Sequence, residues 1–171
     1  MSLAVVWFRR DLRLSDNPAL CAALHEHRQI LPVYIAEPEG QGGWAPGAAS
    51  NWWLHHALSD LSSALDGRLL ICRGPALETL QALVATTGAA TIYWNRCYEP
   101  AAIERDTRIK QAMRDAGTRV DSHNSALLFE PWTVSNRQGL PFRVFTPFWR
   151  HLLSLGLPAK PLPSPDLSGR L

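Results

Sequence analysis

The feature that most constrains the fold of this chain is a repeated alternation between short apolar runs and segments with helical spacing. The first run, Leu3–Phe8, is continuously apolar and contains two valines and two aromatic residues, which is typical of a strand buried on both faces. Further strands are expected at 30–36, 68–72, 91–94 and 119–122. Strands that alternate with helices predict a parallel sheet with right-handed crossovers and helices on both faces.

The intervening segments show the spacing of amphipathic helices. Two of them carry clear apolar stripes, formed by Leu54, Leu58, Leu61 and Leu65 and by Leu77, Leu80 and Val84. Helices are also expected at 18–26, 100–116 and 146–155. The first and last of these open with Asn17-Pro18 and Thr146-Pro147, which are good N-cap and first-turn pairs.

Side-chain directions follow from these stripes. In the helix at 100–116, Ala102, Ile109 and Met113 are expected to face inward, and Gly117 is expected to end the helix. Three charged residues of the same helix are expected to face outward: Glu104, Arg105 and Lys110. Trp52 and Trp53 stand at a helix start, where at least one of them is expected to pack against the sheet.

Together the elements predict the α/β class: a Rossmann-like, three-layer α/β/α domain at 1–155 with a five-stranded parallel sheet in the order 3-2-1-4-5. That order reverses between the first and fourth strands, so the loops after Phe8 and Trp94 should face one another across a ligand-binding crevice. The remaining residues, 156–171, contain four prolines and little apolar content, and are expected to form an extended interdomain linker.

Composition narrows the class of function. The formal charge is only +2, so little direct DNA binding is expected, because generic binders carry a pronounced basic excess. Cys21, Cys72 and Cys97 are widely spaced, and neither they nor the six histidines form a metal-ligand pattern, so no metal site is expected. The sequence has no membrane-spanning run and no secretory signal, which predicts a cytoplasmic protein.

A glycine-rich segment at 40–45 formally fits G-x-G-x-x-[GA]. Glu37-Pro38-Glu39 separates it from the preceding strand and Pro46 follows it, so it lacks the strand-to-helix setting of a dinucleotide-binding loop. A surface loop is the preferred interpretation.

Three further segments resemble the N-terminal domain of the DNA photolyase and cryptochrome family, and they occur in that family's order. They are residues 5–18 (VVWFRRDLRLSDNP), 92–100 (IYWNRCYEP) and 141–149 (PFRVFTPFW). Without the resemblance, the charged residues after Phe8 could simply pair with one another around a tight turn, and Glu99 could be a helix N-cap.

The resemblance implies that this chain is the light-harvesting antenna domain and that an FAD-binding helical domain lies outside it. The intact protein would be a deoxyribodipyrimidine photo-lyase, a carbon–carbon lyase that absorbs light and transfers an electron from FAD to split pyrimidine dimers in damaged DNA. The alternative is a cryptochrome-like blue-light photoreceptor that acts through protein partners. The lesion, a cyclobutane dimer or a (6-4) product, stays open, and this chain alone carries no catalytic residue.

The resemblance assigns the antenna site to three loops. Its residues are Trp7, Arg9, Arg10 and Asp11 after the first strand, Glu37 after the second, and Asn95, Arg96, Cys97, Tyr98 and Glu99 after the fourth. The implied chromophore is methenyltetrahydrofolate, with 8-hydroxy-deazaflavin and flavin mononucleotide (FMN) as alternatives, although Ala101 and Ala102 depart from the folate-type pattern. The domain alone is expected to be largely empty as purified, because it lacks contacts from the helical domain. Its exposed docking face could promote self-association.

Overall fold

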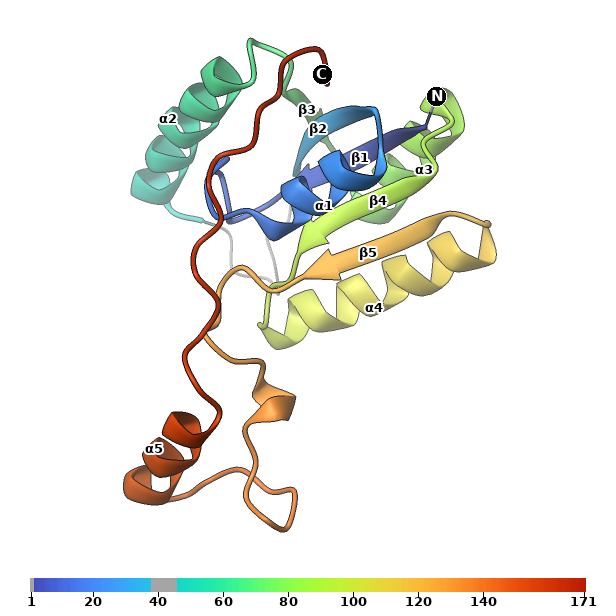
Figure 1. Cartoon of the computed structure of the whole chain (residues 1–171). Coiled ribbons are helices and arrows are strands. Elements are labelled where there is room, and N and C mark those ends of the chain that lie inside the picture. The colour runs from blue at the N-terminus through green and yellow to red at the C-terminus, as the bar shows by residue number, and fades with distance from the viewer. Residues whose placement is uncertain (1, 38–45) are drawn as a thin grey trace. The chain divides into compact units, whose positions relative to one another are not determined.

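A computed structural model describes residues 2–37 and 46–171, and it contains one five-stranded parallel sheet in the order β3-β2-β1-β4-β5 (Figure 1). The strands are β1 (Leu3–Phe8), β2 (Gln29–Ala36), β3 (Leu70–Arg73), β4 (Thr91–Asn95) and β5 (Arg119–His123). The helices are α1 (Pro18–Glu26), α2 (Ala48–Ala64), α3 (Ala76–Thr87), α4 (Pro100–Asp115) and α5 (Phe145–Ser154), and a 3-10 turn spans Pro131–Thr133. The predicted fold class and strand order are confirmed. The glycine-rich segment at 40–45 lies outside the described residues.

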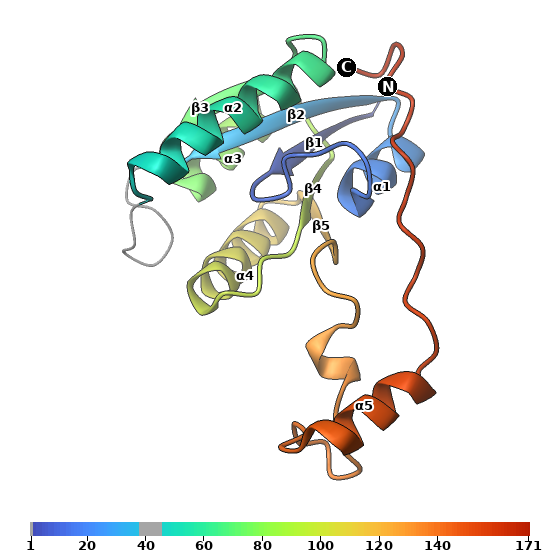
Figure 2. The ribbon, with the colours of Figure 1, turned by 90° about the vertical axis from the view of Figure 1, so that its left-hand side faces the viewer.

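Helices lie on both faces of the sheet (Figure 2). The central strand β1 supplies side chains to two cores, one on each face. Ala4, Val6 and Phe8 pack with buried residues of α1 and α2. Val5 and Trp7 pack with buried residues of α3 and α4. All five are at most 2% exposed. A strand that is apolar on both faces is stable only in a middle layer, which explains why the continuous apolar run lies at the centre of a three-layer domain.

The N-terminus of α1 and the C-terminus of α4 have the predicted caps. Asn17 is the N-cap of α1; its Oδ1 accepts the N–H of Leu20 at 3.1 Å, and Pro18 occupies the first turn. Gly117 follows the last turn of α4 with φ of +77°, a left-handed conformation that glycine adopts without strain.

Several element boundaries differ from the predicted ones by one or two residues, and two of these differences have a clear local cause. β3 begins at Leu70 rather than at 68, because the N–H of Arg68 still bonds the carbonyl of Leu65 in the turn after α2, at 2.9 Å. α5 begins at Phe145, so its N-cap is Val144 and the predicted N-cap, Thr146, lies inside the helix. Pro147 is tolerated there because the first-turn N–H groups have no intrahelical partner.

The segment Leu162–Leu171 packs with the sheet domain, with which it forms one compact unit. Leu167 and Leu171 contact the core on the α1 and α2 face. The Arg170 guanidinium donates to three backbone carbonyls at and after the end of α1, those of Leu24, His27 (2.6 Å) and Arg28 (2.9 Å). This segment therefore satisfies helix-end carbonyls that would otherwise need water. The predicted division at residue 155 stays a prediction.

Residues Ala126–Pro161 form a second compact unit. In it, Phe142 contacts Phe148 and His151, with ring centroids 6.2 and 5.2 Å away, and Phe145 stacks on Trp149 at 6.1 Å. None of its residues is fully buried. Phe145, Trp149 and Leu153 recur at helical spacing on α5 and are between 48% and 70% exposed. The unit therefore presents an apolar helix surface to solvent.

Tyr93 on β4 should make the stability of the folded domain depend on pH in the alkaline range. It is completely buried, and its hydroxyl donates to Glu26 Oε2 at 3.0 Å. Burial, followed by this carboxylate, raises the pKa of Tyr93 to about 12, above the value of about 10 that an unfolded tyrosine has. The folded state therefore retains a proton that the unfolded state loses, so stability falls as pH rises through this window. We expect urea unfolding to show this fall between pH about 10 and 12, and Tyr93→Phe to flatten it. Identical pH slopes for both proteins would contradict the assignment.

Candidate functional site

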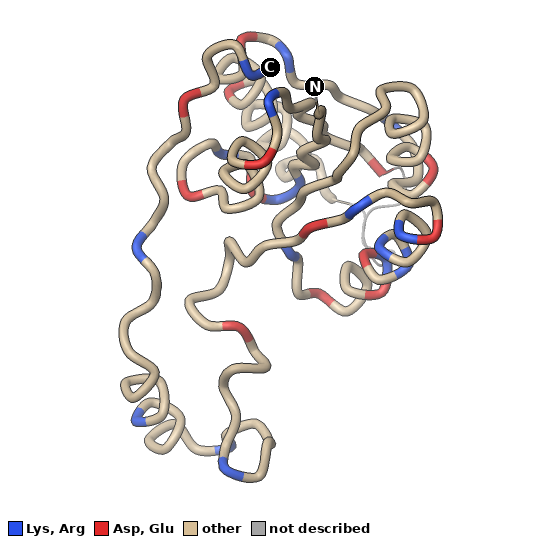
Figure 3. Tube along the Cα trace, turned by 45° about the vertical axis from the view of Figure 1, so that its right-hand side comes forward, with Lys and Arg blue, Asp and Glu red and all other residues tan. Residues whose placement is uncertain are grey.

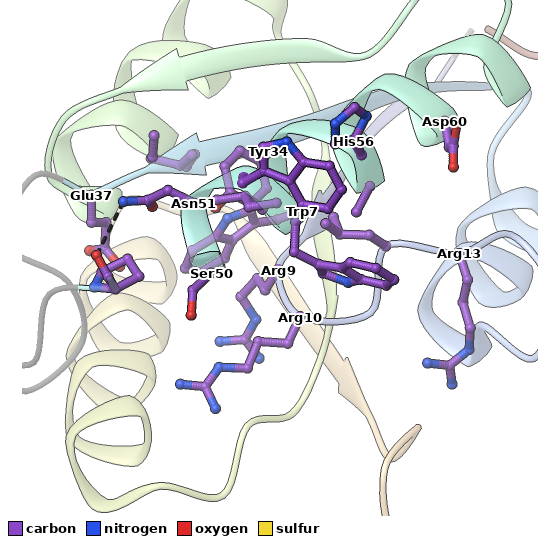
Figure 4. A pocket seen from close by; sticks show the side chains of 18 of the residues that line it. Trp7, Arg9, Arg10, Arg13, Tyr34, Glu37, Ser50, Asn51, His56 and Asp60 are labelled. Atoms are coloured by element: carbon purple, nitrogen blue, oxygen red, sulfur yellow. Dashed lines mark hydrogen bonds between the residues drawn. The ribbon is translucent and has the colours of Figure 1, made fainter. Parts of the chain in front are cut away.

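A pocket of about 1000 Å³ lies at the carboxyl ends of β1 and β2, beside α2 (Figure 4). β1 and the loop after it contribute Trp7, Arg9, Arg10, Leu12 and Arg13. β2 contributes Tyr34, Ile35 and Ala36, and Glu37 follows it. α2, Pro46 before it and Arg105 of α4 complete the lining. The α2 residues include Ser50, Asn51, Trp52, Trp53, His56 and Asp60.

Aromatic side chains line the pocket. Trp7 is 2% exposed, whereas Trp52 and Trp53 are 62% and 71% exposed. The prediction that at least one of the two α2 tryptophans packs into the core is therefore wrong. Leu61 and Leu65 provide the buried contacts of α2, so the tryptophans remain available at the surface. The Trp52 ring contacts His56, with centroids 4.4 Å apart. Exposed indoles beside a pocket are suited to stacking on a planar ligand.

A chain of charged side chains connects the pocket to α4. Arg9, whose side chain is only 3% exposed, donates through Nη1 to both carboxylate oxygens of Asp106, at 2.9 and 2.7 Å. Arg105 also donates to Asp106, at 2.9 and 3.1 Å, and its Nη1 donates to Glu37 Oε2 at 2.6 Å. The predicted outward orientation of Arg105 is thus wrong, since its side chain is 12% exposed. Burial alone would lower the pKa of Arg105, but Asp106 and Glu37 offset this and raise it.

The guanidinium groups of this chain lie against tryptophan rings. The Cζ atoms of Arg9 and Arg105 lie 4.9 and 5.0 Å from the Trp7 ring centroid, and Trp7 packs edge-on to Trp94 at 5.5 Å. Contacts between guanidinium groups and indole faces are favourable, more so when the groups are desolvated. Trp7 is consequently a rigid part of the pocket wall.

The crevice predicted between β1 and β4 holds a network of polar side chains. Asn95 Nδ2 donates to Asp11 Oδ2 at 2.5 Å and to Asn17 Oδ1 at 2.7 Å, and Asn95 Oδ1 accepts the N–H of Ala19 at 3.1 Å. Arg9 also donates to the Asn95 carbonyl. All these groups except Ala19 come from the loop after β1 or the end of β4, so the network joins the two strand ends across the switch point. Asp11 and Asn95 do not line the pocket described above.

The other predicted residues after β4 also lie outside this pocket lining. Glu99 forms an exposed ion pair with Arg10, and Arg96 donates to the carbonyl and, at 3.1 Å, to the hydroxyl of Ser122. Tyr98 is half-buried. Cys97 is half-buried as well, and its burial raises the pKa of the thiol, which keeps it protonated at neutral pH. Arg10 and Glu99 thus connect the pocket rim to the start of α4.

The pocket therefore brings together four of the ten predicted site residues: Trp7, Arg9, Arg10 and Glu37. Sequence reasoning missed the contribution of α2 and the role of Asp106. Both had signals in the sequence. Trp52 lies about half a turn away from the leucine stripe of α2, and Asp106 completes the spacing of the inward residues Ala102, Ile109 and Met113.

Charge on α4 is mixed, with basic and acidic residues interspersed along its length (Figure 3). The residues that the structure describes contain no group of three or more histidine, cysteine, aspartate or glutamate side chains placed to hold a metal ion. Within the same residues, no helix has both the length and the apolar character that crossing a membrane requires.

Comparison with known proteins identifies the family. The family model described as DNA photolyase matches residues 4–166, and the chain belongs to this family. It is 44% identical over 164 residues to a deoxyribodipyrimidine photo-lyase of Agrobacterium fabrum, covering 94% of this chain and 34% of that protein. It is 38% identical to cryptochrome-2 of Arabidopsis thaliana over 165 residues, covering 94% of this chain and 27% of that protein.

Solved structures agree with these relatives. The bacterial class III photolyase from Agrobacterium tumefaciens superimposes with a TM-score of 0.88 and 42% identity, over 100% of this chain and 35% of that one. The archaeal photolyase from Sulfolobus tokodaii gives a TM-score of 0.77 and 26% identity, over 94% and 36%; its structure contains two FAD molecules and implicates a novel light-harvesting cofactor. This chain spans about a third of the length of these proteins.

Proposed function

We propose that this chain is a light-harvesting domain that binds an antenna chromophore in the pocket beside α2. The observation that carries the proposal is an aromatic-lined pocket of about 1000 Å³ at the carboxyl ends of two parallel strands in a member of the DNA photolyase family. The light-harvesting cofactor implicated in the Sulfolobus tokodaii photolyase supports a role of this kind for the fold.

The lining suits a planar heteroaromatic ligand with an anionic tail. Trp52, Trp53 and Tyr34 offer ring surfaces for stacking, and Arg10 and Arg13 offer positive charge at the rim for carboxylates or a phosphate. Methenyltetrahydrofolate and FMN have both features, whereas 8-hydroxy-deazaflavin has the planar ring but an uncharged ribityl tail. Methenyltetrahydrofolate is the ligand that we favour. When bound, it would supply absorption of light, while the protein would orient it and exclude water.

For the intact protein we propose light-driven repair of pyrimidine dimers in DNA, with FAD and the damaged DNA bound outside this chain. The 44% identity to a deoxyribodipyrimidine photo-lyase supports this activity. The 38% identity to cryptochrome-2 supports the alternative, a blue-light photoreceptor that acts through protein partners. A light-dependent repair assay on the intact protein distinguishes the two. A cytoplasmic location also stays a prediction from the sequence.

Removing one exposed indole tests the pocket directly. We expect Trp52→Ala to weaken binding of methenyltetrahydrofolate about 5- to 10-fold, because loss of a stacked aromatic contact costs about 1 kcal/mol. The measurement is an equilibrium titration followed by chromophore fluorescence, repeated with FMN. Trp132→Ala is the matched control, since Trp132 is 66% exposed but does not line the pocket. Equal affinities of both variants and the unaltered protein would exclude this pocket as the chromophore site.

We further propose that the apolar surface of α5, formed by Phe145, Trp149 and Leu153, promotes self-association of the chain. Exposed apolar surfaces of this kind commonly mark interaction sites. Light scattering coupled to gel filtration should show a mass that rises with protein concentration, and Trp149→Ser should shift the equilibrium toward the monomer. A strictly monomeric protein across the concentration range would refute the proposal.

A further inference from the structure

We propose that Asp106 is a positioning residue of the chromophore pocket: it holds Arg9 and Arg105 against Trp7 and so fixes the orientation of the pocket wall. The inference rests on the proposed function of the pocket. It adds a residue that does not line the pocket itself. That residue stands on α4, which packs on the opposite face of the sheet from α2 and already contributes Arg105 to the lining.

The contacts of Asp106 carry the inference. Its side chain is 10% exposed, and its two oxygens accept four hydrogen bonds, two from Arg9 and two from Arg105, between 2.7 and 3.1 Å. Both donors line the pocket, whereas Asp106 does not. A single carboxylate thus joins two pocket residues from distant parts of the chain, Arg9 in the loop after β1 and Arg105 on α4. Because hydrogen bonds between charged groups are short and directional, they define where both guanidinium groups lie.

The two guanidinium groups in turn restrict the positions of Trp7 and Glu37, which they contact. They lie 4.9 and 5.0 Å from the Trp7 ring centroid, and Arg105 also donates to Glu37 at 2.6 Å. Trp7 is already limited on another side by Trp94. With Asp106 in place, the ring and the carboxylate that face a ligand have one defined arrangement. Loss of Asp106 would leave two desolvated cations without their shared partner, and they would move to find another.

A fixed wall matters for an antenna because energy transfer depends on the mutual orientation of the donor and acceptor transition dipoles. A wall that is not fixed before binding also lowers affinity, since binding must then offset the entropy of ordering the wall as well as the ligand. Asp106 therefore influences the orientation of a bound chromophore as well as its affinity. A purely structural ion pair would affect only stability.

The test compares Asp106→Asn with Asp115→Asn, a matched control at an exposed position of the same helix. The probes are methenyltetrahydrofolate and FMN, titrated separately. We expect Asp106→Asn to raise the dissociation constant about 5- to 30-fold and to reduce the induced circular dichroism of the bound probe at saturation. Asp106→Glu, which keeps the charge, should restore part of both signals. Without ligand, the near-ultraviolet circular dichroism of Trp7, isolated by subtracting the spectrum of Trp7→Phe, should also diminish in Asp106→Asn.

The outcomes separate the two proposals. If neither probe binds the unaltered protein, the proposed function fails, and the ligand-free signal of Trp7 still tests the positioning role. If the probes bind and Asp106→Asn has unchanged affinity and unchanged spectra, the positioning role is overturned. Should Asp106→Asn not fold, Arg105→Lys takes its place, because a lysine cannot bond Asp106 and Glu37 in the same geometry and should reduce the same signals. Spectra of Arg105→Lys identical to those of the unaltered protein would likewise overturn the role.

Discussion

Replacing Asn95 by aspartate should destabilise the domain more than any conservative change elsewhere in the pocket region. Asn95 is 2% exposed, and its amide nitrogen donates to Asp11 and Asn17 at 2.5 and 2.7 Å. A carboxylate at this position cannot donate, so Asp11 Oδ2 loses its partner and Asn17 Oδ1 keeps only the N–H of Leu20. Two negative charges would also face each other in a desolvated site. We expect the free energy of unfolding to fall by about 3–5 kcal/mol at neutral pH.

The pH dependence of Asn95→Asp distinguishes this cause from a simple loss of packing. The introduced carboxyl would lie in a site that favours its neutral form, so its pKa would be raised and the folded state would bind more protons than the unfolded state. Part of the lost stability should therefore return as pH falls toward about 5. Urea unfolding at several pH values measures this. Asn136→Asp is the control, because the Asn136 side-chain oxygen accepts the N–H groups of Gln138 and Leu140, and an aspartate oxygen can accept them as well. A deficit that stays constant with pH would point to another cause.

The network around Asn95 shows which features of the fold and site the sequence predicts and which it does not. The positions of the strands and the buried faces of the helices follow from apolar periodicity, which depends on near neighbours along the chain, and β1 and the leucine stripe of α2 confirm this. The strand order is expected because it is common in this fold class. The location of the pocket depends instead on which polar groups satisfy one another across the sheet. Asn95 and Asp11 are 84 residues apart. No local pattern indicates that they bond, and their network lies in the crevice that strand order alone assigns to a ligand.

Asp106 and Trp52 show a second limit of sequence-based prediction, because both residues depart from the apolar pattern of their helices in a way that the sequence shows. An aspartate in the register of Ala102, Ile109 and Met113 indicates a buried carboxylate, which requires cationic partners. The sequence does not name them, since Arg9 lies 97 residues away. A tryptophan off the apolar stripe indicates a surface role. Only the fold brings these residues to one pocket.

Removing the segment Leu162–Leu171 should have an effect comparable with that of Asn95→Asp. The sequence suggests an extended linker, but the segment makes the contacts of a structural element. Leu167 and Leu171 cover the core, and the carbonyl of Arg170 accepts the N–H of Ile30 at 2.8 Å. The N–H of Asp16 donates to the Leu162 carbonyl at 2.8 Å, and the N–H of Leu162 donates to the Asp16 side-chain Oδ1 at 3.2 Å. Two partly buried leucines contribute about 1 kcal/mol each, and unsatisfied buried polar groups cost about 1–3 kcal/mol. We expect a chain that ends at Pro161 to lose about 3–5 kcal/mol of unfolding free energy.

Arg170→Ala isolates the helix-end contribution to this loss. The Arg170 guanidinium bonds the carbonyls at the end of α1, where positive charge is also favoured by the helix dipole, so the substitution alone should cost about 1.5–3 kcal/mol. Lys160→Ala is the matched control, because Lys160 is an exposed cation just before the segment. Urea unfolding gives the free energy of unfolding of the unaltered chain, the chain that ends at Pro161, Arg170→Ala and Lys160→Ala. If Arg170→Ala and the shortened chain are as stable as Lys160→Ala, the segment is a linker after all, since a segment without structural contacts can be removed without changing the free energy of unfolding.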